Sequence, residues 1–314
     1  MASACQSPSP RYRHTTLRLK RIAATITGSV AIALSLVSGP AFAGDPFRAT
    51  NPHAIDDQTE AAFKALFEQG NYVDANRLLS RPNSNEPLAY AIKASLAYLA
   101  QDNGALDRNA TSTLEAAQRL VQTDPLRGHL YTAVGHFLEG AYALKTQGTL
   151  AATPMVLGKL QQVFDELQAA ERIAPNDPEL NLIKGYMDLM LAVNLPFANP
   201  NDAIQRLQSY AAPSYLAQRG IAIGYRDLRQ PEQALAAVDR ALAETPNNPD
   251  LFYLKAQILR NQNKSTESLE FFDRALQLSE QLPQGLVNQI AYEECRTRGA
   301  NGCSALLRRT RPAS

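Results

Sequence analysis

The residues best suited to chemistry are few and widely spaced in this chain. Histidine, a common general base and zinc ligand, occurs four times among 314 residues. His129 and His136 are seven positions apart, so on a helix they share a face but stand about 10 Å apart. One metal ion cannot span that distance without ligands from a third element. We therefore predict no metal site and no bound cofactor.

Motifs of nucleophilic and phosphate chemistry are absent from the sequence. It contains no glycine-rich phosphate loop, no G-x-S-x-G and no H-E-x-x-H. The adjacent acids Asp56-Asp57 and Glu293-Glu294 point apart on a helix or cap one, so neither forms a catalytic pair. We predict that the chain is not an enzyme, with a hydrolase built from side chains of several helices as the alternative.

Two cysteines near the C-terminus form the other reactive pair. Cys295 and Cys303 are separated by Gly299 and Asn301-Gly302, which accept the positive φ angles of a tight loop. In an exported chain we expect a disulfide, with two free thiols as the alternative. The bridge is predicted to support a C-terminal cap and not to be redox-active, because catalytic pairs are usually C-x-x-C.

Residues 1–43 have the pattern of a secretory signal peptide. Five basic residues and no acid occur in this segment, an apolar run follows over residues 22–37, and Ala41-Phe42-Ala43 forms an A-x-A site. An uncleaved anchor is the alternative, but about 16 residues diluted by hydroxyls are few for a bilayer span, which needs about 20. We predict cleavage after Ala43 and export to the periplasm or a thylakoid lumen, with no stable membrane insertion afterwards.

The charge balance limits the class of partner. The whole chain carries 31 basic and 30 acidic residues, and loss of the five basic residues of the leader leaves 26 and 30, a net charge of −4. A nucleic-acid binder needs a clear positive excess, so we predict no nucleic-acid partner.

The elements that position any site are predicted to be helices. Aromatic residues make up only 7% of the chain, with no tryptophan, whereas alanine and leucine are abundant. One type of dipeptide recurs at the expected helix starts, where the first side chain caps amide groups and proline loses no hydrogen bond. These dipeptides are Asp124-Pro125, Asp177-Pro178, Asn199-Pro200 and Asn248-Pro249.

A register of 34 residues relates the C-terminal third of the chain to itself. The matched pairs are Ala222 with Ala256, Ala234 with Ser268, Val238 with Phe272 and Ala241 with Ala275. Small residues at these offsets let two antiparallel helices touch, and the large residue fills the notch left by the next repeat. Residues 215–280 resemble the tetratricopeptide-repeat family.

The resemblance implies an all-α fold, a right-handed α-solenoid of about five antiparallel helix pairs. We divide the chain into a signal peptide (1–43), an extended segment (44–57), a helical repeat domain (58–283) and a C-terminal part (284–314). The last part holds a capping helix, the cysteine loop and a basic tail. Extra residues at 191–197 lengthen one unit and are predicted either to pack in the core or to present a loop over the groove.

Other short segments of the sequence resemble exported tetratricopeptide-repeat proteins of cyanobacteria. They are GDPFR at 44–48, Asn51-Pro52, TEAAFK at 59–64 and the run at 175–190. This resemblance covers nearly the whole mature chain and implies compartment and fold but no activity.

In the repeat family the first helix of each pair lines a concave groove. Projection through the 34-residue register predicts these groove positions: Tyr186, Met190, Arg219, Arg226, Tyr253, Gln257 and Arg260. Arginines that lie among tyrosines form a surface suited to an extended acidic peptide or a free C-terminal carboxylate. The equally weighted alternative is that the arginines are solvated surface residues and the tyrosines pack between helices. We predict a non-enzymatic scaffold or adaptor that binds a protein or peptide. The alternatives are a structural assembly subunit of the envelope and a helical cell-wall-acting enzyme.

Overall fold

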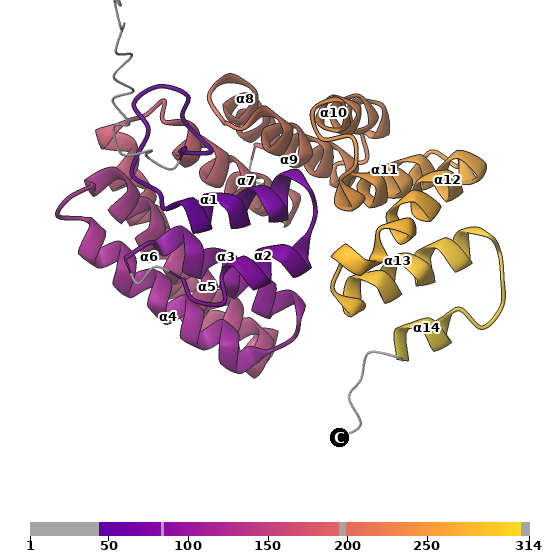
Figure 1. The fold of residues 1–314 in the computed structure, drawn as a ribbon, viewed down its shortest axis with the longest axis horizontal. Helices are drawn as coiled ribbons and strands as arrows, with labels where there is room; N and C mark the ends of the chain where they lie inside the picture. Colours follow the sequence, from indigo (N-terminus) through magenta and orange to yellow (C-terminus); the bar gives the residue numbers. More distant parts are fainter. Residues whose placement is uncertain (1–43, 83–84, 195–198, 309–314) are drawn as a thin grey trace, which may run out of the picture. The chain divides into compact units, whose positions relative to one another are not determined.

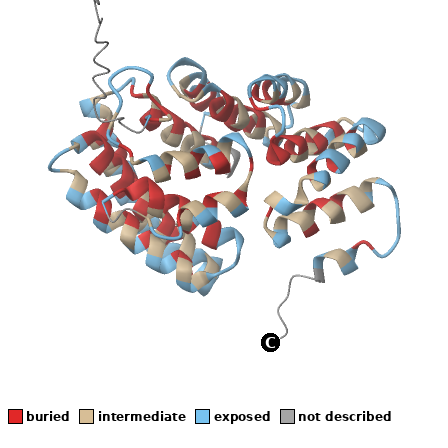
Figure 2. Ribbon diagram, viewed as in Figure 1, coloured by how far each residue is buried: buried red, intermediate tan, exposed pale blue. Residues whose placement is uncertain are grey.

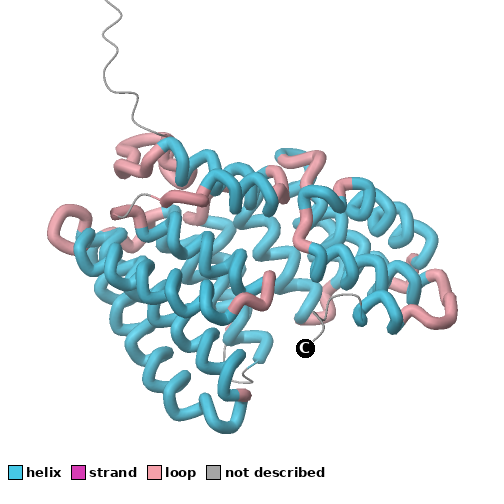
Figure 3. The backbone as a smooth tube through the Cα atoms, turned by 60° about the horizontal axis from the view of Figure 1, so that its bottom comes forward, coloured by secondary structure: helices cyan, strands magenta, loops and turns pink. Residues whose placement is uncertain are grey.

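The computed structural model describes residues 44–82, 85–194 and 199–308, and within these residues it contains helices and loops but no strand (Figure 3). The prediction of an all-α fold is confirmed. The predicted signal peptide, part of the 191–197 insertion and the end of the basic tail lie outside the described residues.

Six helix pairs follow one another through the described part of the chain, one more than the sequence predicts (Figure 1). The first helix α1 (Asp57–Phe63) continues as a π-helix, η1 (Lys64–Glu68), and pairs with α2 (Tyr72–Leu78). The next pairs are α3 (Pro87–Leu99) with α4 (Asn103–Leu120), α5 (Pro125–Gln147) with α6 (Thr149–Ile173), and α7 (Pro178–Asn194) with α8 (Pro200–Ser209). The last are α9 (Ser214–Asp227) with α10 (Pro231–Glu244) and α11 (Pro249–Asn261) with α12 (Ser265–Gln277). A 3₁₀ turn, η2 (Ser279–Gln281), leads to α13 (Gln284–Thr297) and α14 (Ser304–Arg308).

The four predicted Asp-Pro and Asn-Pro helix starts are confirmed. Asp124, Asn199 and Asn248 accept backbone N–H groups at the starts of α5, α8 and α11, and each is followed by proline at the first position of its helix. Asp177 accepts the N–H of Leu180 at 2.9 Å in the same way at the start of α7. Capping therefore sets where these helices begin.

Small residues bring neighbouring helices into close contact. The repeat-register residues Ala222, Ala241, Ala256 and Ala275 are completely buried, and so is Phe272. The buried positions follow the faces that helices turn toward each other (Figure 2). This is the packing that the 34-residue register predicts.

The first helix pair packs against the last two pairs, far away in sequence. The Tyr72 hydroxyl donates to Asp250 Oδ2 at 2.6 Å, across 178 residues. Asn248 Nδ2 donates to the carbonyls of Phe67 and Glu68 at 3.0 and 3.1 Å. Gly70 has φ +65°, and a Cβ there would lie 2.7 Å from Asn248 Oδ1, so only glycine fits both its conformation and its surroundings.

The extended segment is predicted at residues 44–57; residues 44–56 contain no helix and contribute to the core, whereas Asp57 begins α1. Phe47 and Ile55 are buried, and the Phe47 ring packs edge-on against Phe63 with 4.9 Å between ring centroids. This segment is therefore a structural part of the repeat array.

The cysteine loop joins the last two helices. Cys295 in α13 and Cys303, which directly precedes α14, form a disulfide with their Cα atoms 5.8 Å apart. Helix α13 packs on α12, as expected of a cap. None of the helices in the described ranges is both long enough and apolar enough to cross a membrane.

Candidate functional site

Two adjoining cavities hollow the surface formed mainly by α3, α5 and α7, which are the first helices of successive pairs. The larger has a volume of about 680 Å³ and is lined by α3, α5, α6 and α7. The smaller, of about 420 Å³, is lined by Phe47 and by α1, η1, α3, α5, α7 and α9. Four residues line both cavities: Ser95, Phe137, Leu138 and Met190. We call the two cavities together the apolar groove.

The mouth of the apolar groove carries large apolar side chains that solvent reaches. Tyr98 and Leu99 at the end of α3, Leu144 in α5 and Met190 in α7 line the larger cavity, and each is between 40% and 46% exposed. Isolated exposed apolar residues are common on protein surfaces, but a group of them around a cavity marks a binding site.

The rim of the apolar groove is positively charged. Lys145 Nζ donates to the Tyr98 carbonyl at 2.7 Å and lies 4.2 Å from the centre of the Tyr98 ring. Lys159 Nζ and His136 Nδ1 contact the same carboxylate oxygen of Glu139 at 2.7 and 3.0 Å. Burial alone would raise the pKa of Glu139, but the hydrogen bonds from Lys159 and His136 lower it overall, so Glu139 is ionised. The rim therefore carries two lysines, Lys145 and Lys159, and one carboxylate, Glu139, which gives it an excess of positive charge.

Three of the seven predicted groove residues line the apolar groove, namely Tyr186, Met190 and Arg219. The Tyr186 hydroxyl donates to the Leu216 carbonyl at 2.7 Å, and burial raises the pKa of Tyr186 to about 12. Arg219 Nη2 lies 3.3 Å from Asp250 Oδ2. The Tyr186 hydroxyl and the Arg219 guanidinium therefore hold α7, α9 and α11 together at the end of the apolar groove.

The other four predicted residues form a separate polar cluster with the capping helix. Arg226 Nη1 donates to Gln257 Oε1 at 2.6 Å. Glu293 of α13 accepts from Tyr253 at 2.6 Å and from Gln257 at 3.3 Å, and it pairs with Arg260 at 2.9 Å. Burial alone would raise the pKa of Glu293, but hydrogen bonds, from Tyr253 first and then Gln289, and the charge of Arg260 lower it overall.

Sequence reasoning missed Glu293 in this cluster, just as it missed Tyr98, Leu99, Leu144 and Lys145 at the apolar groove. As one of two adjacent acids Glu293 carries no signal of its own, and its role becomes visible only when α13 is placed against α11. All three predicted arginines have a carboxylate neighbour within the chain: Arg219 with Asp250, Arg226 with Asp227 and Arg260 with Glu293. An acidic peptide has to compete with these carboxylates, and its binding here stays a prediction.

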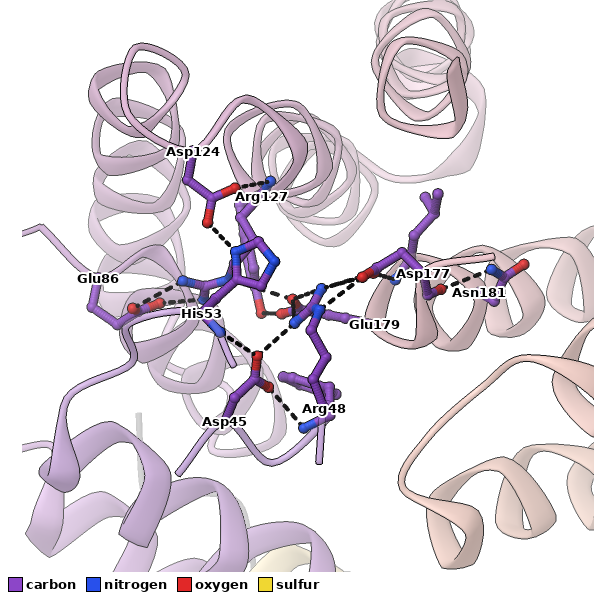
Figure 4. Close-up of polar contacts among 12 residues, drawn as sticks. Asp45, Arg48, His53, Glu86, Asp124, Arg127, Asp177, Glu179 and Asn181 are labelled. Atoms are coloured by element: carbon purple, nitrogen blue, oxygen red, sulfur yellow. Dashed lines mark hydrogen bonds and ion pairs between the residues drawn. The ribbon is translucent and has the colours of Figure 1, made fainter. Parts of the chain in front are cut away.

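A buried polar network joins the starts of three helices that line the apolar groove (Figure 4). Arg48 pairs with Asp45, Asp177 and Glu179, with N–O distances between 2.7 and 3.0 Å. Arg127 of α5 pairs with Glu86 at 2.8 Å and with Glu179 at 3.3 Å. Together these contacts join the N-terminal segment to the starts of α3, α5 and α7.

The carboxylates of this network exceed its arginines. The Tyr131 hydroxyl donates to Glu179 Oε1 at 2.5 Å and adds a neutral donor to the most buried acid. Burial raises the pKa of Glu86, although Arg127 opposes this shift. We therefore interpret the network as a structural anchor that needs both of its cations, Arg48 and Arg127.

The three histidines among the described residues each contact a carboxylate. His53 contacts Asp124, and His129 Nδ1 lies 2.7 Å from Glu166 Oε2. Within the described ranges, no three or more His, Cys, Asp or Glu residues are grouped so as to hold a metal ion.

Comparison with known proteins bears on the C-terminal half of the chain. Residues 219–283 match the tetratricopeptide-repeat family. The predicted repeat region, 215–280, is thereby confirmed. No match was found among curated proteins. A tetratricopeptide repeat protein of known crystal structure from Parabacteroides merdae ATCC 43184 is 15% identical, with 81% of this chain and 99% of that chain covered and a TM-score of 0.42.

The tetratricopeptide-repeat match begins at Arg219, in α9, and extends past α12. Arg226, Tyr253, Gln257 and Arg260 lie on the first helices of its two helix pairs. The larger cavity of the apolar groove lies upstream of the match, between α3 and α7. Sequence resemblance therefore directs attention to the C-terminal repeats, whereas the open apolar surface is on the preceding pairs.

Proposed function

We propose that this chain is a non-enzymatic scaffold that binds a helix of a partner protein in the apolar groove and acts in an exported compartment. The observation that carries the proposal is the exposed apolar mouth formed by Tyr98, Leu99, Leu144 and Met190 around the larger cavity. Tetratricopeptide repeats, matched here at residues 219–283, typically mediate protein–protein binding.

The proposed occupant is an amphipathic helix with an acidic residue beside its apolar stripe. Apolar residues at positions i, i+3, i+4 and i+7 would enter the groove, as in other helix-in-groove complexes. The acidic residue would meet the rim at Lys145, whose ammonium contacts a carbonyl and a ring but no carboxylate among the described residues. Charge complementarity selects this class of helix over a basic one.

Export is supported by two independent features. The N-terminal 43 residues have the order of a signal peptide, with a basic region, an apolar run and an A-x-A site. The disulfide between Cys295 and Cys303 is of a kind that persists mainly in oxidising compartments such as the periplasm. The resemblance to exported cyanobacterial proteins agrees with both features.

Selection from a displayed library of helical peptides tests the binding proposal. Peptides selected by the wild-type protein should carry an apolar stripe and flanking acidic residues. The variant Leu99→Asp/Leu144→Asp should weaken their binding at least about tenfold, because it puts two charges at an apolar mouth. Leu150→Asp is the matched control, since Leu150 lies on the same α5–α6 hairpin, is 93% exposed and does not line the cavity.

Three results would redirect the proposal. Equal binding to the wild type and the double variant would remove the groove as the site. Selected peptides that depend on Arg226 or Arg260 would place binding at the polar cluster with Glu293. A stable oligomer at micromolar concentration that binds no peptide would favour the structural assembly subunit.

A further inference from the structure

The first residue after the predicted cleavage point contacts a carboxylate. The backbone nitrogen of Gly44 donates to Glu60 Oε2 at 2.7 Å. The other oxygen of Glu60 pairs with Lys64 Nζ at 2.6 Å, and the Glu60 side chain is only 16% exposed. One oxygen of a largely buried carboxylate is therefore directed at the nitrogen that becomes the N-terminus if the leader is removed.

We propose that Glu60 binds the α-ammonium group that cleavage after Ala43 creates on Gly44. Hydrolysis of the Ala43–Gly44 peptide bond by a signal peptidase consumes one water, leaves the carboxylate on Ala43 and converts the neutral N–H of Gly44 into a cationic group. The hydrogen bond to Glu60 thus becomes a charge-assisted ion pair, which is shorter and stronger than a neutral one. This inference rests on the proposed export, but not on the proposed ligand.

The residues that follow Gly44 explain why its position matters. Asp45 Oδ1 accepts the N–H of Phe47 at 2.8 Å, and Asp45 Oδ2 accepts from Arg48 at 2.8 Å and from the N–H of His53 at 3.0 Å. Phe47, held between these contacts, lines the smaller cavity of the apolar groove. The ion pair at Gly44 therefore fixes the start of the segment that contributes Phe47 to the lining of the groove.

The experiment uses the exported protein made from the full chain with its leader. Its mass should correspond to residues 44–314. Wild type, Glu60→Gln and Glu68→Gln are then compared at pH 6.5, each with the α-amine intact or converted to a carbonyl by selective transamination. Glu68 is an exposed acid of the neighbouring turn and serves as the matched control.

Loss of the α-ammonium should lower the melting temperature of the wild type and of Glu68→Gln by roughly 1–3 °C. It should leave Glu60→Gln unchanged, because that variant has no charge for the ammonium to pair with. Amide exchange over residues 45–55 should increase in the same samples.

Two outcomes would overturn the inference, and they differ in meaning. A mature protein that begins at another residue would refute the proposed cleavage site together with this role of Glu60. A protein that begins at Gly44 but loses the same stability with and without Glu60, or loses none, would refute the role of Glu60 alone. Neither outcome bears on peptide binding in the groove.

Discussion

The guanidinium of Arg48 reaches the carboxylates of Asp177 and Glu179, which follow it by 129 and 131 residues. Arg48 Nε and Nη2 each donate to Asp177 at 2.7 Å in a bidentate pair, and Nη1 and Nη2 both donate to Glu179 at 3.0 Å. The side chains of both acids are at most 6% exposed. This relationship attaches the N-terminal segment to the start of α7, one of the helices that line the apolar groove.

Replacing Arg48 should therefore strongly destabilise the folded protein. Arg48→Met should reduce the free energy of unfolding by about 3–5 kcal/mol, because Asp45, Asp177 and Glu179 stay buried without this cation. Urea denaturation measures the change. Arg77→Met is the control, since Arg77 makes an exposed ion pair with Asp74. Its loss should change the free energy of unfolding by less than about 0.5 kcal/mol. Similar losses in the two variants would show that the network is not an anchor.

Replacing two helical glycines by alanine should change the free energy of unfolding in opposite directions. A Cβ on Gly220 would lie 2.7 Å from the ring of Tyr186, whose hydroxyl is held by the Leu216 carbonyl, so Gly220→Ala should cost about 1–3 kcal/mol. A Cβ on Gly158 meets no atom within 4 Å, so Gly158→Ala should stabilise α6 by about 0.5–1 kcal/mol. Thermal and urea unfolding of both variants check the signs, and equal signs would contradict the close α7–α9 contact.

The contact between the first and last helix pairs should weaken when the Tyr72 hydroxyl is lost. Tyr72→Phe removes the donor to Asp250, whose pKa burial has already raised, and should cost about 1–3 kcal/mol. Hydrogen exchange should increase in α2 and at the start of α11. Tyr210→Phe, at a tyrosine that is 47% exposed, should change neither quantity. Unaltered exchange in Tyr72→Phe would mean that other contacts hold the two ends together.

Acid should loosen the capping helix through Glu293. The pKa of Glu293 in the folded protein lies below its ordinary value of 4.5. Its contribution to stability is therefore complete above the unfolded pKa and is lost as the pH falls through the folded pKa. The protection factors of α13 amides, which are exchange rates corrected for the intrinsic effect of pH, should fall more steeply from pH 6 to pH 3 in the wild type than in Glu293→Gln. Parallel curves would exclude Glu293 as the acid-sensitive contact.

Reduction of the disulfide should affect only the end of the chain. Cys303→Ser should increase exchange after about residue 284 and leave α3 to α9 unchanged, because the loop closed by the bridge spans only 8 residues in sequence. Free thiols in the purified exported protein, or an unchanged melting curve for Cys303→Ser, would contradict this role.

The sequence by itself determined the helical fold, the starts of α5, α7, α8 and α11, and the repeat pairing of α9 to α12. These features depend on neighbours close along the chain, because a cap such as Asp124 bonds to a residue three positions away and Ala222 and Ala256 are one 34-residue period apart in successive units. Periodicity and capping are local, so they can be read from residue types alone.

Only the tertiary structure decided which surface stays open. The contacts of Tyr72 with Asp250, of Arg48 with Glu179 and of Glu293 with Tyr253 join residues that are 178, 131 and 40 positions apart. The first two depend on small rotations accumulated over several helix pairs, and the third depends on how α13 lies against α11; no residue type signals either. Arg219 and Arg260 consequently meet distant carboxylates of their own chain, whereas apolar side chains of α3, α5 and α7 line the open groove.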